Sequence, residues 1–159
     1  MAKAIHPRKG LALVEVQHAE ASALATGGEA TISSSLAVCV GACGPGTAQL
    51  LNGLYDCHRN HLPVLAIVAQ VPSYEIGSSY FQETRPELLF RDCSHYCATI
   101  AVPAQAVRVT EAAVQVALGR GGVGVVVLPA DVVVHLAALA TAPPGEAALR
   151  AAHLAHLLN

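Results

Sequence analysis

Two short apolar runs enclose the most regular stretch of the sequence. Residues 36–40 and 64–68 contain only Val, Leu, Ile, Ala and Cys, a composition typical of strands buried on both faces of a parallel sheet. Residues 47–60, which lie between them, repeat leucines at helical spacing. The stretch therefore predicts a strand, a loop, a helix and a second strand parallel to the first.

Similar patterns continue on both sides of this unit. Apolar or alternating runs predict strands at residues 11–17, 97–102 and 123–128. Helical spacing predicts helices at residues 18–31 and 104–119, although a pair of glycines weakens the first of them. The order of these elements indicates an α/β domain with a mainly parallel sheet.

The two ends of the chain differ from this middle part. Residues 1–10 are basic and lack the apolar core of a secretion signal, and we expect them to form a disordered leader. Residues 141–145 contain two prolines and are typical of a linker. Residues 146–159 then repeat apolar positions at helical spacing. We expect one domain over residues 11–140, followed by the linker and a further helix.

Composition limits the class of protein. A chain of 159 residues suits one core, since a domain of this size buries about 70% of its unfolded surface. Because 53% of the residues are hydrophobic and 13% are charged, the chain needs a large core or partner surfaces that cover it. The net charge of −2 comes without a basic stripe, so nucleic acid is not expected as a partner. The most apolar stretch, residues 123–140, is interrupted by Gly124, Pro129, Asp131 and His135, which argues against a membrane span.

The five cysteines point to reduced thiols in a cytoplasmic protein, because their number is odd and no secretion signal precedes them. Two groups combine cysteine with histidine, namely Cys57, His58 and His61, and Cys93, His95 and Cys97. Both groups are open to a metal-binding interpretation, but neither has the CxxC spacing of a zinc knuckle. Small buried cysteines and surface histidines are the favoured interpretation.

A glycine loop joins the first strand of the central unit to its helix. It contains Gly41, Gly44, Pro45 and Gly46. Ligands of open parallel sheets bind at the carboxyl ends of strands, where this loop is expected, and the start of the helix offers free N–H groups. The loop matches neither the dinucleotide fingerprint GxGxxG nor the phosphate loop GxxxxGK[ST]. It therefore predicts a ligand site but does not identify the ligand.

Several longer motifs occur in one order: GACGPG, LLNGLYDCHRNHLPVLAI, QVPSYEIGSSYFQET, ELLFRDCSHYC and GVVVLPADV. Together they resemble the pyrimidine-binding (PYR) domain of thiamine-diphosphate-dependent enzymes. Bacterial pyruvate oxidases, also called pyruvate dehydrogenases (quinone), are the most similar, and acetohydroxyacid synthases are wider relatives. The resemblance runs from about residue 11 to residue 158. It implies a three-layer α/β/α fold that lacks the family's first strand-helix segment.

The resemblance fails at one catalytic position. The stretch QHAEASALATGGEA resembles the family's strand-to-helix junction, where a Glu directly follows the His. In the family this Glu bonds the pyrimidine ring of thiamine diphosphate and promotes the tautomer that activates the cofactor. The matching residue here is Ala19, which cannot exchange a proton. Glu20 follows one place later and on a helix would point about 100 degrees away; it remains a possible substitute.

The resemblance also implies binding residues. The positions that match the family's pyrimidine pocket are Gly44, Pro45, Gly46 and Gln49. Residues 70–90 predict a long functional loop, in which Phe81 and Gln82 match a pair that faces the substrate in the oxidases. The alternative is a Phe packed beneath the loop beside an exposed Gln.

The family also uses Mg²⁺, held by a diphosphate-binding domain with a GDG…N motif, and the oxidases hold FAD in a middle domain. Neither domain has a counterpart in these 159 residues, and residues 146–159 resemble the first helix of a truncated middle domain. We therefore expect a truncated PYR domain of a pyruvate-oxidase-like enzyme, inactive alone. Activity on pyruvate would need a homo-oligomer or a complementary diphosphate-binding chain. The alternatives are a small subunit of a split enzyme and a non-catalytic module that docks on a full-length oxidase.

Overall fold

Parallel strands form the sheet of the computed structural model, which describes residue 10 and residues 12–141. Within this part of the chain the sheet has four strands in the order β1-β2-β4-β3, all parallel. The strands are β1 (Ala37–Gly41), β2 (Val64–Gln70), β3 (Tyr96–Thr99) and β4 (Val123–Pro129). Ala37 of β1 lies opposite Val64 of β2, which in turn lies opposite Val123 of β4. The predicted parallel sheet is confirmed.

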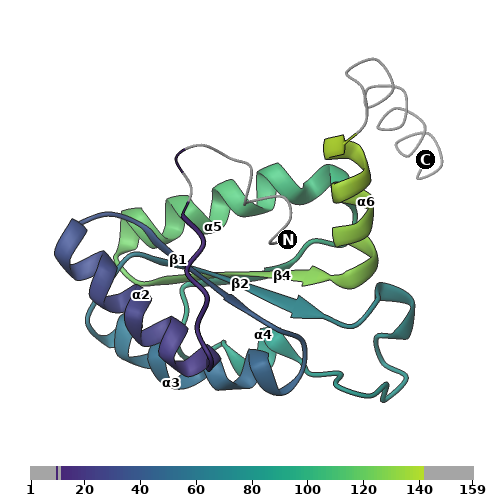
Figure 1. Ribbon diagram of the computed structural model, residues 1–159, viewed down its shortest axis with the longest axis horizontal. Helices are drawn as coiled ribbons and strands as arrows, with labels where there is room; N and C mark the ends of the chain where they lie inside the picture. Colours follow the sequence, from purple (N-terminus) through teal and green to yellow (C-terminus); the bar gives the residue numbers. More distant parts are fainter. Residues whose placement is uncertain (1–9, 11, 142–159) are drawn as a thin grey trace.

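Helices cover both faces of this sheet (Figure 1). One face carries α2 (Ala19–Ser33), α3 (Pro45–Arg59) and the short α4 (Pro86–Leu89). The other face carries α5 (Ala106–Arg120) and α6 (Ala130–Thr141). Two 3₁₀ turns, η1 (Ser73–Glu75) and η2 (Pro103–Gln105), lie in the connections. The three-layer α/β/α arrangement that the resemblance implied is therefore present.

Separate apolar clusters fill the two interfaces between the sheet and its helices. The cluster beneath α2 and α3 includes Leu50, Leu54 and Phe90, all fully buried. The cluster beneath α5 and α6 includes Ile100 and Val126. Every residue of β4 is buried, which explains its uninterrupted apolar sequence. Burial of this apolar area is the main favourable term for the fold.

Two glycines let α2 and α3 approach each other closely. A Cβ atom at Gly27 would lie 2.8 Å from Cys57 Sγ, and one at Gly53 would lie 2.6 Å from Ala23 Cβ. Both glycines are buried in their helices. Glycine costs a helix about 1 kcal/mol relative to alanine, and close packing of the two helices compensates for that cost here.

The strand predicted at residues 11–17 is wrong for the part that the structure describes. Residues 12–16 have no regular secondary structure and are exposed, with Val14 78% accessible. The segment runs across the outer edge of β1 instead of pairing with it (Figure 1). Alternating residues favour a strand only where a neighbouring strand accepts its hydrogen bonds.

The structure describes only part of the segments predicted at the two ends of the chain. The leader at residues 1–9, the linker at residues 142–145 and the helix at residues 146–159 lie outside the described residues. Thr141, assigned to the linker, is the last residue of α6, a helix that the sequence patterns did not predict. None of the described helices is long and apolar enough to cross a membrane.

Candidate functional site

The candidate site lies at the carboxyl end of the sheet, where the glycine loop joins β1 to α3. Gly44 is buried and has a φ of 73° and a ψ of −121°, a conformation that favours glycine. Pro45 follows as the first residue of α3, where its missing N–H costs no hydrogen bond. The glycine loop thus lies at the carboxyl end of β1 and leads directly into a helix, as the sequence predicts.

The long loop after β2 packs directly on this glycine loop. A Cβ atom at Gly44 would lie 2.7 Å from Gln82 Cβ and 3.0 Å from the Gln82 carbonyl oxygen. Gln82 itself has a φ of 69°, which is unusual for a residue with a side chain. The structure thus brings together two residues that the resemblance places in the pyrimidine pocket and beside the substrate.

The other predicted binding residues lie in the first part of α3 or next to Gln82 in the chain. Pro45, Gln49 and Gln82 are exposed, and Gly46 is half-buried. Phe81 is 83% exposed, so it is not packed beneath the loop. An exposed ring and an exposed amide are available to a ligand or to a partner chain.

Gln70, the last residue of β2, holds the two loops together and was not singled out in the sequence. Its side-chain Nε2 donates to the Thr84 carbonyl at 2.6 Å, and its Oε1 accepts from the Val71 N–H at 2.9 Å. The Cys43 thiol lies 4.0 Å from the same Oε1 and 3.5 Å from the Gln82 carbonyl. A glutamine that closes an otherwise apolar strand is the signal that could have identified it.

Two carboxylates fix the rest of the loop. Asp131, in the first turn of α6, accepts from the Ser73 N–H at 2.9 Å and from the Ser73 hydroxyl at 2.6 Å. Glu83 accepts from the Gly77 N–H at 2.7 Å. Burial alone would raise the pKa of Asp131, but the hydrogen bonds from Ser73 and from nearby backbone hold it below its usual value.

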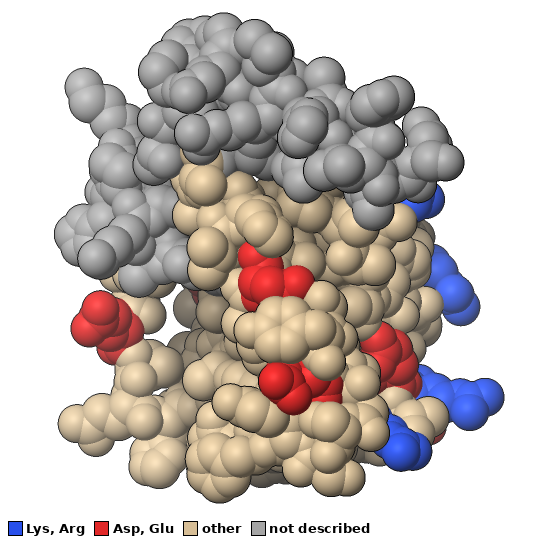
Figure 2. Space-filling view, turned by 90° about the vertical axis from the view of Figure 1, so that its right-hand side faces the viewer, with Lys and Arg blue, Asp and Glu red and all other residues tan. Residues whose placement is uncertain are grey.

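Figure 2 shows this end of the molecule, with acidic side chains in the middle of the view and basic ones toward its right-hand side. Three carboxylates form hydrogen bonds with residues of the loop after β2, namely those of Glu75, Glu83 and Asp131. Phosphate groups bind where cations or helix N-termini face them. The start of α3 is one such N-terminus, whereas the carboxylates around it disfavour a phosphate group.

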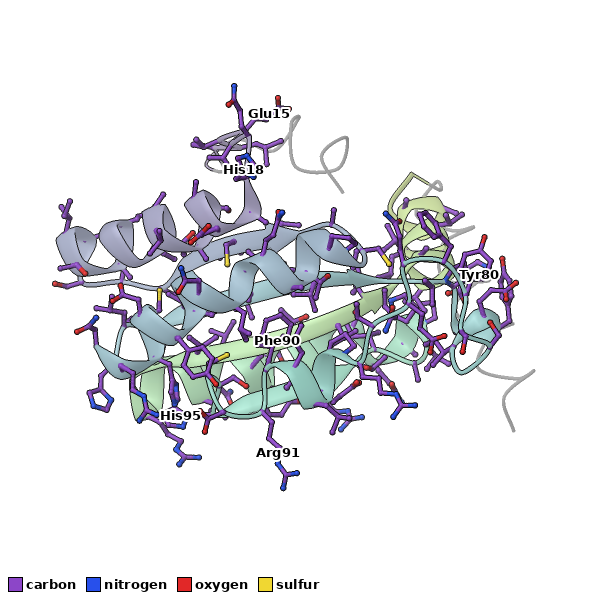
Figure 3. All side chains as sticks on the ribbon, turned by 90° about the horizontal axis from the view of Figure 1, so that it is seen from below. Glu15, His18, Tyr80, Phe90, Arg91 and His95 are labelled. Atoms are coloured by element: carbon purple, nitrogen blue, oxygen red, sulfur yellow. The ribbon has the colours of Figure 1, made fainter. Side chains whose placement is uncertain are left out.

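The residue that the resemblance matches with the family's Glu is Ala19, at the junction before α2. Ala19 is the first residue of α2 and packs against the apolar cluster beneath the helix. The Glu20 carboxylate accepts from Asn52 Nδ2 at 2.5 Å and is thus held against α3. Glu15 and His18 project from the outer side of the molecule, away from the loop that carries Tyr80 (Figure 3).

The groups of cysteine and histidine lie at the opposite end of the sheet. Cys57 and Cys93 are fully buried, and burial raises the pKa of each thiol to about 11. His58 and His95 pack edge to face with ring centroids 4.5 Å apart. All five cysteines are free, and the described residues contain no group of three or more His, Cys, Asp and Glu side chains that could hold a metal ion.

Comparison with known proteins gives the family. Residues 1–89 match the family model of the "Thiamine pyrophosphate enzyme, N-terminal TPP binding domain", thiamine pyrophosphate being another name for thiamine diphosphate. A protein of Pseudomonas amyloderamosa named "Uncharacterized 42.6 kDa protein in isoamylase 3'region" is 50% identical over 137 residues, which cover 86% of this chain and 35% of that protein.

Two enzymes are similar over a comparable stretch. Pyruvate oxidase of Lactiplantibacillus plantarum is 34% identical over 118 residues, 74% of this chain and 20% of the oxidase. Acetolactate synthase of Arthrospira platensis is 30% identical over 118 residues, 74% of this chain and 20% of the synthase. The chain thus spans only 20% to 35% of the length of these relatives. By its sequence and its fold, the chain belongs to the thiamine pyrophosphate enzymes and corresponds to their N-terminal TPP-binding domain.

Proposed function

We propose that this chain supplies the pyrimidine-binding half of a thiamine diphosphate site in a pyruvate-oxidase-like assembly. The contact between Gly44 and Gln82 carries the proposal, because the glycine loop and the loop after β2 lie next to each other there, at the carboxyl ends of the strands. The family match and the similarity to a pyruvate oxidase support it.

The residues at this contact fit a flat polar ring. The start of α3 leaves N–H groups unpaired by the helix, and Gly44, which has no side chain, lets Gln82 pack directly beside them. The exposed Gln82 amide can both donate and accept hydrogen bonds. Gly44, Gly46 and Gln49 would hold the pyrimidine, whereas the diphosphate and its Mg²⁺ would be held by another chain or domain.

The fit does not extend to activation of the ring. When bound, thiamine diphosphate would supply the nucleophilic carbon for chemistry on a keto acid. Ala19 offers no group that holds or moves a proton at the pyrimidine, and Glu20 is engaged by Asn52. Losing a positioned acid or base lowers a rate by about 10² to 10⁴. The chain's own contribution is therefore binding and enclosure, with Phe81 and Gln82 facing pyruvate, and electron transfer to FAD belongs to the larger assembly.

Backbone NMR of the isotope-labelled chain tests this function with two fragments of the cofactor. The probes are the aminopyrimidine of thiamine and inorganic diphosphate. The pyrimidine should shift the amide signals of Gly44, Gly46 and Gln82, and diphosphate should not. Shifts from diphosphate alone, or no saturable shift from the pyrimidine at these residues, would contradict the proposal.

A second candidate is a non-catalytic module that docks on a full-length oxidase. The exposed apolar side chains on the loop after β2 favour it: Tyr74 is 76% and Phe81 is 83% exposed. Mixing the chain with a full-length pyruvate oxidase tests it by light scattering. A complex that forms equally well without thiamine diphosphate favours the docking module, and a complex that needs the cofactor favours the half-site.

A further inference from the structure

Gln70 is an unusual residue for its place in the sheet. It closes β2, a strand whose other residues are apolar, and only 4% of its surface is accessible. A buried amide is costly unless its donors and acceptors are satisfied. Its role must therefore lie in the partners that its side chain reaches.

Those partners fix the orientation of the amide. The Val71 N–H needs an acceptor and lies 2.9 Å from Oε1, whereas the Thr84 carbonyl needs a donor and lies 2.6 Å from Nε2. If the amide oxygen and nitrogen were exchanged, the NH₂ group would face the Val71 N–H, another donor, and the oxygen would face the Thr84 carbonyl, another acceptor. The Cys43 thiol is 4.0 Å from Oε1, on the side of the glycine loop. The amide thus lies between the two loops of the candidate site.

Gln82 needs such support because its backbone conformation is unfavourable. A φ of 69° costs a residue with a side chain about 1–2 kcal/mol. Such a conformation persists only where surrounding contacts determine it. A turn closed by the Glu83 N–H and the Tyr80 carbonyl at 2.8 Å supports this conformation locally. The contacts that fix the turn on the site are the Cys43 thiol, 3.5 Å from the Gln82 carbonyl, and the tether of Thr84 to Gln70.

We infer that Gln70 is a positioning residue that sets Gln82 against Gly44 by anchoring Thr84 and the Cys43 side of the glycine loop. Its consequence for ligand binding rests on the proposed function, but its effect on the two loops does not. Asp131 still holds the loop at Ser73 when Gln70 is changed. Loss of the amide should therefore loosen the loop locally and leave the sheet folded.

The test compares Gln70→Met with Thr47→Val. Met fills a similar volume without hydrogen bonds. The buried Thr47 hydroxyl lies near the same strand ends, 2.7 Å from the Ala42 carbonyl and 3.2 Å from the Ala69 carbonyl, and neither of these belongs to the loop after β2. The readouts are the Gly44 and Gln82 amide signals and the rate at which a small thiol reagent modifies Cys43.

In Gln70→Met both amide signals should move and Cys43 should react about tenfold faster, the effect of one lost buried hydrogen bond. Thr47→Val should leave the Gln82 signal unchanged, because its bonds reach Ala42 and Ala69 and not the loop after β2. Unchanged signals and rate in Gln70→Met, or an equal change of the Gln82 signal in Thr47→Val, would overturn the inference. The pyrimidine probe is titrated separately: if the native chain does not bind it, the proposed function fails, while the loop readouts still decide the role of Gln70.

Gln70→Glu provides a second test that does not depend on the folding of Gln70→Met. When protonated, the introduced carboxyl group donates to the Thr84 carbonyl and accepts from the Val71 N–H, whereas the carboxylate repels that carbonyl. The native positions of the Gly44 and Gln82 signals should therefore return as the pH falls, which a residue with a merely space-filling role would not show. A pH-independent Gln70→Glu spectrum would contradict the inference.

Discussion

Gln82 fills the space that a side chain at Gly44 would need, since a methyl group on Gly44 would lie 2.7 Å from Gln82 Cβ. The contact joins two loops that leave the carboxyl ends of neighbouring strands, β1 and β2. Glycine is thus needed for two reasons, its backbone conformation and the proximity of Gln82. The candidate site depends on this packing, because it sets the distance between the glycine loop and the exposed Gln82 amide.

Gly44→Ala should lower the unfolding free energy by about 2 kcal/mol or more, since strain and steric overlap add. Gly77→Ala is the matched control, because Gly77 also has a positive φ, of 91°, but nothing lies within 4 Å of the added Cβ. It should cost about 1 kcal/mol. Urea denaturation measures both, and equal losses would show that Gln82 does not constrain Gly44.

The neighbouring glycines of α2 should respond in opposite directions. Gly28 is exposed and a Cβ there meets nothing, so Gly28→Ala should stabilise the chain by about 0.5–1 kcal/mol. A Cβ at Gly27 meets Cys57 Sγ at 2.8 Å, and Gly27→Ala should destabilise it by about 1–3 kcal/mol. Thermal unfolding of the two variants measures the difference, and a stabilising Gly27→Ala would contradict the close packing of α2 on α3.

A local sequence pattern predicts buried strands well but cannot predict contacts between distant segments. The strands β1, β2 and β4 were predicted within two residues at each end because each is an apolar run. Burial on both faces accounts for the runs of β2 and β4, whereas β1 leaves Val38 and Val40 exposed. Residues 12–16 show the same kind of signal without a partner strand, which no local pattern reveals. The α6 helix follows the apolar β4 directly, so the composition changes little at their boundary. The role of Gln70 was not predicted, because its hydrogen-bond partners lie in loops that only the fold brings together.

Asp131 should make the loop less stable in acid. Its pKa is held below its usual value of 3.8, so the folded protein binds this proton less readily than the unfolded chain does. The stabilisation is fully present above pH 3.8 and is lost as the pH falls through the pKa of Asp131 in the folded protein. Asp131→Asn should weaken the Ser73 contacts at neutral pH by about 1 kcal/mol. Its difference from the native chain should shrink in acid; a constant difference would contradict this account.

The pair of His58 and His95 should give a separate pH dependence nearer neutrality. Burial, followed by the charge of His95, lowers the pKa of His58 below 6.5, and the buried His58 Nδ1 has no hydrogen-bond partner among the described residues. Unfolding therefore takes up a proton, and stability should decrease as the pH falls below 6.5. His58→Phe keeps a ring against His95 and should flatten that part of the curve. Replacing the exposed His135 controls for the loss of one histidine elsewhere.

Ala19→Glu tests whether the missing acid is what limits the assembly. Combined with a partner that carries the diphosphate-binding domain, this variant should decarboxylate pyruvate about 10² times faster than the native chain or more, since it restores an acid-base group. Glu20→Gln is the control, because Glu20 is held by Asn52 and should contribute little. Unchanged turnover in Ala19→Glu together with a large loss in Glu20→Gln would instead assign the proton transfer to Glu20. That outcome would require the Glu20–Asn52 hydrogen bond to break when the partner binds, because a carboxylate held on α3 cannot also reach the ring.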